Sequence, residues 1–147
     1  MFRVLVAATV AACVFLEQTP RRGTLPPALR SHIASERFDA VSSGRGFPLD
    51  VRTELQALFA NPALDFAIIN TPFPVVVSPK GQLPATTLVA GGCAQDHCLV
   101  YYERAGNPST WSVALFSWSP TATKLEWSGK APAGLKAIAE VKAALTK

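Results

Sequence analysis

Two stretches of the chain carry hydrophobic residues at the three- and four-residue spacing of an amphipathic helix. The first follows Asp50, which we expect to cap a helix that ends at Asn61-Pro62. Its apolar positions are Val51, Leu55, Leu58 and Phe59. The second lies at the C-terminal end, and Pro132 is expected in its first turn. Its apolar positions are Leu135, Ile138, Val141 and Leu145.

Short apolar runs separated by turn residues lie between these two helices, a pattern that is typical of antiparallel strands. The candidate strands are 66–69, 75–77, 85–90, 98–103, 111–118 and 124–128. Gly106-Asn107-Pro108 separates two of them and predicts a hairpin. Alternation along 111–118 divides its side chains between two faces. One face carries Trp111, Val113 and Leu115, and the other carries Ala114, Phe116 and Trp118. The predicted fold class is α+β, an antiparallel β-sheet meander with flanking helices that include a C-terminal helix.

The first twenty residues are expected to be a signal peptide or export leader. One arginine precedes the apolar run Val4–Leu16, which is shorter than the roughly 20 residues of a membrane-spanning helix. Val10-Ala11-Ala12-Cys13 resembles a lipoprotein processing site, so membrane attachment is expected only if Cys13 is lipidated. We therefore predict export to the periplasm, and a cytosolic protein with a buried first strand is the alternative.

The remainder of the chain divides into two parts. Residues 21–47 contain Pro26-Pro27 and little periodicity, so we expect a linker or N-terminal arm with a short helix near 33–41. Residues 48–147 are expected to form a single α+β domain. A hydrophobic fraction of 49% and a charged fraction of 16% agree with a folded core.

The positive charge of the chain does not indicate a nucleic-acid partner. The formal net charge is +4, but the basic residues are scattered, and only Arg21-Arg22 are adjacent. Nucleic-acid-binding segments usually cluster their basic residues.

Three cysteines are present, and the two outside the leader, Cys93 and Cys98, are expected to form a disulfide in an oxidising compartment. Closing so short a loop stabilises a protein by only about 2 kcal/mol in the chain-entropy model. The bridge would, however, hold Gln95, Asp96 and His97 rigidly, which lowers the entropy cost of binding a partner. We therefore favour a recognition loop over a purely structural bridge.

Motifs for catalysis are missing from the sequence, which has no glycine-rich phosphate loop, no Gly-x-Ser-x-Gly and no Cys-x-x-Cys. We expect no enzyme, no cofactor and no metal. The alternative metal hypothesis is a zinc site formed by Cys93, His97 and Cys98, with His32 as a fourth ligand. Export disfavours it, because oxidation removes both sulfur ligands.

The segment Gly92–Cys98, GCAQDHC, with the strand and tryptophan-containing return strand that follow it, resembles the inhibitor of vertebrate lysozyme (Ivy) family. The resemblance spans roughly 85–145, including Leu115-Phe116-Ser117 and Leu125-Glu126-Trp127. It implies an exported α+β protein of Gram-negative bacteria. In that family a protruding, disulfide-closed loop plugs the lysozyme cleft, where its histidine meets the catalytic carboxylates.

Carried over by position, Cys93 and Cys98 clamp the loop, His97 is the plug residue and Asp96 is its neighbour. Two features differ from the family pattern. The family order His-Asp is reversed here, and Gln95 replaces the family's proline. Animal lysozymes are basic like this chain, which makes long-range attraction unfavourable. The expected partners are therefore lysozyme or a bacterial muralytic enzyme such as a lytic transglycosylase. The alternative is a non-catalytic cell-envelope protein, structural or ligand-binding, whose disulfide is only scaffolding.

Overall fold

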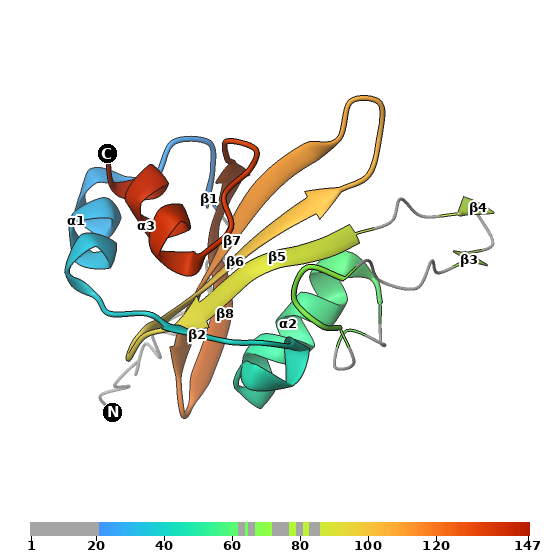
Figure 1. Ribbon diagram of the computed structural model, residues 1–147. Helices are drawn as coiled ribbons and strands as arrows, with labels where there is room; N and C mark the ends of the chain where they lie inside the picture. The colour runs from blue at the N-terminus through green and yellow to red at the C-terminus, as the bar shows by residue number, and fades with distance from the viewer. Residues whose placement is uncertain (1–20, 62–63, 65–66, 72–76, 79–80, 83–85) are drawn as a thin grey trace, which may run out of the picture.

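A computed structural model describes residues 21–147, apart from 62–63, 65–66, 72–76, 79–80 and 83–85. Its main feature is a six-stranded sheet with the order β1-β8-β7-β6-β5-β2 (Figure 1). Four long strands form its centre as consecutive antiparallel neighbours. They are β5 (Thr86–Cys93), β6 (His97–Arg104), β7 (Thr110–Ser119) and β8 (Ala122–Lys130). The predicted antiparallel meander and α+β class are confirmed.

Both edges of the sheet come from the N-terminal part of the described chain. β1 (Arg21–Arg22) pairs in parallel with β8, and β2 (Asp39–Ala40) pairs antiparallel with β5. Along the chain, helix α1 (Pro27–Ser35) lies between these two strands. It begins at a proline, whose missing N–H is not needed in the first turn. The segment expected to be a linker or arm is thus built into the sheet, and its helix ends earlier than the predicted 33–41. The expected leader, 1–20, lies outside the described residues.

One face of the sheet is covered by helix α2 (Leu49–Phe59). Its buried residues Val51, Leu55 and Phe59 belong to a hydrophobic cluster that includes strand residues Cys98 and Phe116. The helix agrees with the predicted periodicity, but Asp50 lies in its first turn and Pro48 occupies the cap position. The helix ends where Ala60 adopts a left-handed backbone, just before Asn61.

Helices α1 and α3 (Ile138–Thr146) cover the opposite face (Figure 1). Ile33 of α1 and Val141 of α3 are fully buried there. The C-terminal helix begins later than expected, because Gly134 has a positive φ of 83° and Ala137 is extended. Pro132 and Leu135 therefore precede the helix.

The sheet is buried on both faces, and the alternation predicted for β7 is confirmed. Val113 and Leu115 pack in the cluster under α1 and α3, whereas Ala114 and Phe116 pack in the cluster under α2. Burial on both faces explains why β6 reads as a nearly continuous apolar run.

Smaller elements complete the described structure. A 3-10 turn spans Gly44–Gly46, and β3 (Val77–Ser78) pairs antiparallel with β4 (Gly81–Gln82). The strand predicted at 66–69 is reduced to an isolated bridge between Ile68 and Ser43, and the one predicted at 75–77 lies mostly outside the described residues. Among the helices of the described chain, none has the length and apolar character needed to span a membrane.

Candidate functional site

The hairpin between β5 and β6 ends in the predicted disulfide. Cys93 and Cys98 face one another in the ladder, with their Cα atoms 4.1 Å apart, and their sulfur atoms are bonded. The backbone N–H of Ala94 donates to the carbonyl of His97 over 2.7 Å. From β7, the N–H of Trp118 donates to the carbonyl of Asp96 over 2.8 Å. A covalent bond and two backbone hydrogen bonds therefore hold this four-residue turn.

Only part of the predicted recognition loop is exposed. Gln95 and Asp96 are exposed at the tip, Ala94 is half-buried, and His97 and Cys98 are buried. Cys98 packs in the cluster under α2. Because both sulfur atoms are consumed by the disulfide, the alternative zinc site with thiolate ligands does not form in this structure.

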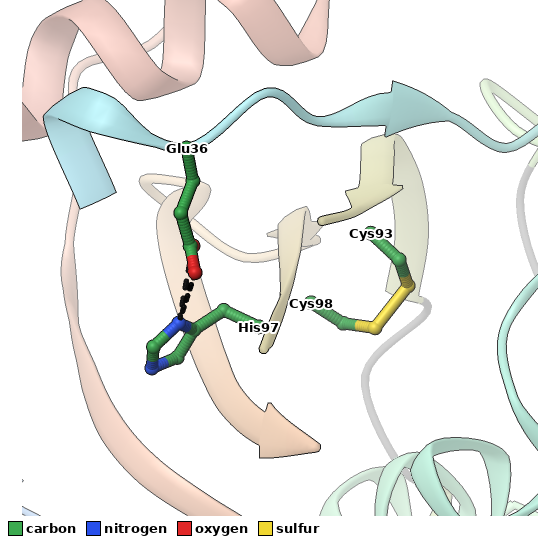
Figure 2. Close-up of a disulfide and its surroundings, with 4 residues drawn as sticks. All are labelled: Glu36, Cys93, His97 and Cys98. Carbon is green, nitrogen blue, oxygen red and sulfur yellow. Dashed lines mark hydrogen bonds and ion pairs between the residues drawn. A yellow bond between two sulfur atoms is a disulfide. The ribbon is translucent and has the colours of Figure 1, made fainter. Parts of the chain in front are cut away.

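His97 points inward, on the opposite side of β6 from the disulfide (Figure 2). Its side chain is 8% exposed, and its Nδ1 lies 2.9 Å and 3.1 Å from the two carboxylate oxygens of Glu36. Its Nε2 lies 3.3 Å from Oε2 of Glu126 on β8. The residue expected to protrude as the plug is instead held between two carboxylates of its own chain.

Strand alternation explains this orientation. Side chains two residues apart share one face of a strand, so His97 lies on the same face as Leu99 and Tyr101. Both of these pack in the cluster under α1 and α3, whereas Cys98 packs under α2. The two-residue spacing of His97 from Leu99, and of Leu99 from Tyr101, is therefore the sequence signal for an inward-pointing His97.

Glu36 is brought to this position by the end of α1. It caps the helix through its backbone N–H, which donates to the carbonyl of Ile33, and its own carbonyl accepts a hydrogen bond from Lys142 of α3. Its side chain is 9% exposed. The close approach of β2 to β5 brings this segment near the hairpin, and a Cβ at Gly92 would lie 2.8 Å from the carbonyl oxygen of Asp39.

One turn earlier on α1, His32 adds a second imidazole. Its Nε2 lies 3.1 Å from Oε1 of Glu36 and 3.7 Å from Oδ2 of Asp96. The rings of His32 and His97 meet edge to face, with centroids 5.2 Å apart. We call His32, Glu36, Asp96, His97 and Glu126 the acid–histidine cluster. It combines two imidazoles with three carboxylates from α1, the hairpin tip and β8.

The sequence places Asp96 and His97 in one loop and offers His32 as a candidate ligand, but no sequence pattern indicates Glu36 or Glu126. No local pattern links these acids to the loop, because Glu36 precedes His97 by 61 positions and Glu126 follows it by 29. Only the packing of α1 and the pairing of β7 with its neighbours bring them together.

A cavity of about 820 Å³ lies away from the hairpin, between β8 and the end of α3. Its lining includes Arg30, Trp127, Lys130 and Lys147. Among its described lining residues there is no histidine, aspartate or glutamate.

No protein-family model, curated protein or solved structure matches this chain. The resemblance of the disulfide-closed segment to a lysozyme-inhibitor family therefore depends on the residues of this chain alone.

Proposed function

We propose that this chain is an exported, non-catalytic protein that binds a lysozyme-type peptidoglycan-cleaving enzyme through the Cys93–Cys98 hairpin end. The observation that supports the proposal is the exposed pair Gln95 and Asp96 on a turn closed by a disulfide. A turn that is already rigid loses little entropy when it binds. The class of partner comes from the resemblance of residues 92–98 to the inhibitor family.

The chemistry of the tip residues fits a glycosidase cleft. Such a cleft holds a protonated carboxylic acid and an ionised carboxylate close together. The side-chain amide of Gln95 donates hydrogen bonds suited to the ionised carboxylate, and the carboxylate of Asp96 accepts a hydrogen bond from the protonated acid. In this proposal Gln95 and Asp96 contact the partner enzyme, and the buried His97 holds the turn in place.

His97 acts as a positioning residue in this account. The imidazole connects the start of β6 to Glu36, which follows α1, and to Glu126 of β8. These contacts restrain the strand on which the tip is mounted, so the tip is presented in one orientation.

A second candidate function is supported by the burial of Cys98, which is 0% exposed. In that alternative the bridge only scaffolds the end of the sheet in a non-catalytic envelope protein. Substitution of the exposed tip residues would then have no effect on the binding of other proteins.

Binding of the oxidised full chain to immobilised hen lysozyme, and separately to a bacterial lytic transglycosylase, tests the proposal. We expect saturable binding to at least one enzyme, and we expect Asp96→Asn to weaken it about 30-fold or more, since truncating a hot-spot residue costs about 2 kcal/mol or more. Asp50→Asn is the matched control, because it makes the same charge change at an exposed position on α2. Equal binding by both variants, or no binding to either enzyme, would overturn the proposal.

A further inference from the structure

We propose that the acid–histidine cluster is a binding site for a divalent transition-metal ion of the zinc class. The protein ligands are Nε2 of His32, Oε1 of Glu36 and Nδ1 of His97, and the fourth position is open to solvent on the side of Asp96. This ligand set contains no cysteine, so the disulfide remains intact when the metal binds.

The spacing of the ligand atoms agrees with a tetrahedral metal. Zinc–ligand bonds of 2.0 to 2.2 Å place neighbouring ligand atoms about 3.3 Å apart. Oε1 of Glu36 lies 2.9 Å from Nδ1 of His97 and 3.1 Å from Nε2 of His32. The ligand atoms of these three residues all lie within 4.8 Å of one another. The two contacts of Glu36 with the histidines are therefore within a few tenths of an ångström of the tetrahedral spacing.

Asp96 lies at the solvent side of the same group. Its Oδ2 is 3.7 Å from Nε2 of His32, and the two side chains are 58% and 49% exposed. The side chains of Glu36 and His97 are 9% and 8% exposed, so they form the buried floor of the site. The site is thus built on a fixed base and has an open side through which an ion can enter.

Counting hydrogens around His97 gives an independent reason for a cation. A neutral imidazole has one N–H, so it can donate to only one of the two carboxylates it faces. The other nitrogen needs a positive species between it and a carboxylate, either a second proton or a metal ion. His32 adds another ring nitrogen directed at the same oxygen of Glu36, and a single metal ion satisfies all three atoms at once.

Glu126 lies where a carboxylate can accept the second ring N–H of a metal-bound His97. Metal-ligating histidines usually donate their second ring N–H to a carboxylate, which fixes the tautomer and orients the ring. With Nδ1 of His97 on the metal, its Nε2–H faces Oε2 of Glu126 at 3.3 Å. Two nitrogen ligands and one carboxylate oxygen favour a borderline ion such as Zn²⁺ over the hard ions Mg²⁺ and Ca²⁺.

Titration of the chelator-treated, oxidised full chain with zinc by calorimetry tests the site, after treatment with a thiol-alkylating reagent. We expect one zinc per chain. His32→Ala should weaken binding at least tenfold without unfolding the protein, because His32 is half exposed, and Glu126→Gln should weaken it about 10- to 100-fold. Asp50→Asn, which alters an exposed acid outside the cluster, should bind zinc like the unchanged chain.

Long-range ¹H–¹⁵N spectra of the imidazoles separate the metal from the rival second proton. Zinc should shift Nδ1 of His97 and Nε2 of His32 while Nε2 of His97 keeps its proton. Absence of saturable zinc binding, or equal binding by His32→Ala, would overturn the proposal. No partner enzyme is present in these measurements, so their failure is distinguishable from failure of the proposed enzyme binding.

Discussion

Nδ1 of His97 lies 2.9 Å from Oε1 of Glu36, although the two residues are 61 positions apart in the chain. The contact joins the first residue of β6 to the end of α1, and both side chains are more than nine-tenths buried. It ties the base of the disulfide-closed turn to the helical layer. The turn that carries the exposed Gln95 and Asp96 is consequently held by the contact of His97 with Glu36 as well as by the disulfide.

Removing the imidazole should destabilise the protein. In His97→Ala, the nearly buried carboxylate of Glu36 loses two contacts and is left without its main partner. Leaving a buried acceptor unsatisfied costs about 1–3 kcal/mol, and more when the group is charged. Urea unfolding should therefore show a clear decrease in the free energy of unfolding. His32→Ala is the control, since this half-exposed side chain should cost less than about 1 kcal/mol. Equal losses in the two variants would contradict the supporting role of His97.

The disulfide should contribute modestly to stability. In the chain-entropy model a loop as short as Cys93–Cys98 contributes about 2 kcal/mol. We expect the Cys93→Ala/Cys98→Ala variant to remain folded and to lose about this amount in chemical denaturation. Unfolding of the variant under native conditions would show that the disulfide contributes far more than about 2 kcal/mol to the free energy of unfolding.

Gly92→Ala should disturb the edge strand β2. The added methyl group would lie 2.8 Å from the carbonyl oxygen of Asp39, which is backbone and cannot rotate away. Overpacking of this kind costs about 1–3 kcal/mol. Hydrogen exchange should report it locally, because the N–H of Val41 donates to the carbonyl of Gly91 over 3.0 Å. Faster exchange at Val41 is expected, and unchanged protection there would contradict the close approach of the two strands.

Stability should fall in alkaline solution partly because of Tyr101. Burial raises the pKa of its phenol above the ordinary value of 10.0, although backbone hydrogen bonding near Leu135 acts in the opposite direction. Above pH 10 the unfolded chain therefore releases this proton more readily than the folded chain, and the free energy of unfolding decreases as pH rises. The phenol also donates to the carbonyl of Pro132 over 2.8 Å.

Tyr101→Phe isolates this contribution. The variant should be less stable at pH 8, because it loses the hydrogen bond, but its stability should decline less steeply above pH 10. Unfolding curves of the unchanged chain and of Tyr101→Phe, measured at pH 8 and above pH 10, provide the comparison. Parallel pH profiles would show that Tyr101 titrates alike in the folded and unfolded chains.

Periodicity predicted the elements whose residues repeat a pattern over several turns or strand positions. Helix α2 and strands β5 to β8 belong to this group, and the two-sided alternation of β7 was readable from Val113 to Phe116. The short elements were not predictable in this way. β1 and β2 have two residues each, and their pairing depends on strands that lie far away in the chain.

The candidate site shows the same division. Cys93, Cys98 and the polar turn between them were visible as a local motif, and the disulfide forms as expected. The direction of His97 depends on strand parity, and its partners Glu36 and Glu126 come from a helix end and a neighbouring strand. A linear motif contains no information on such long-range contacts, so the buried half of the site emerged only from the fold.

The most direct test of the proposed function is the rate at which hen lysozyme or a lytic transglycosylase clears a cell-wall suspension as the oxidised full chain is added. We expect the rate to fall with added protein for at least one of the two enzymes. Substituting Gln95 and Asp96 together by alanine should restore the rate, while Asp50→Asn should still inhibit. Unchanged clearing by both enzymes at every concentration of the chain would contradict the proposal and favour a scaffolding role for the disulfide.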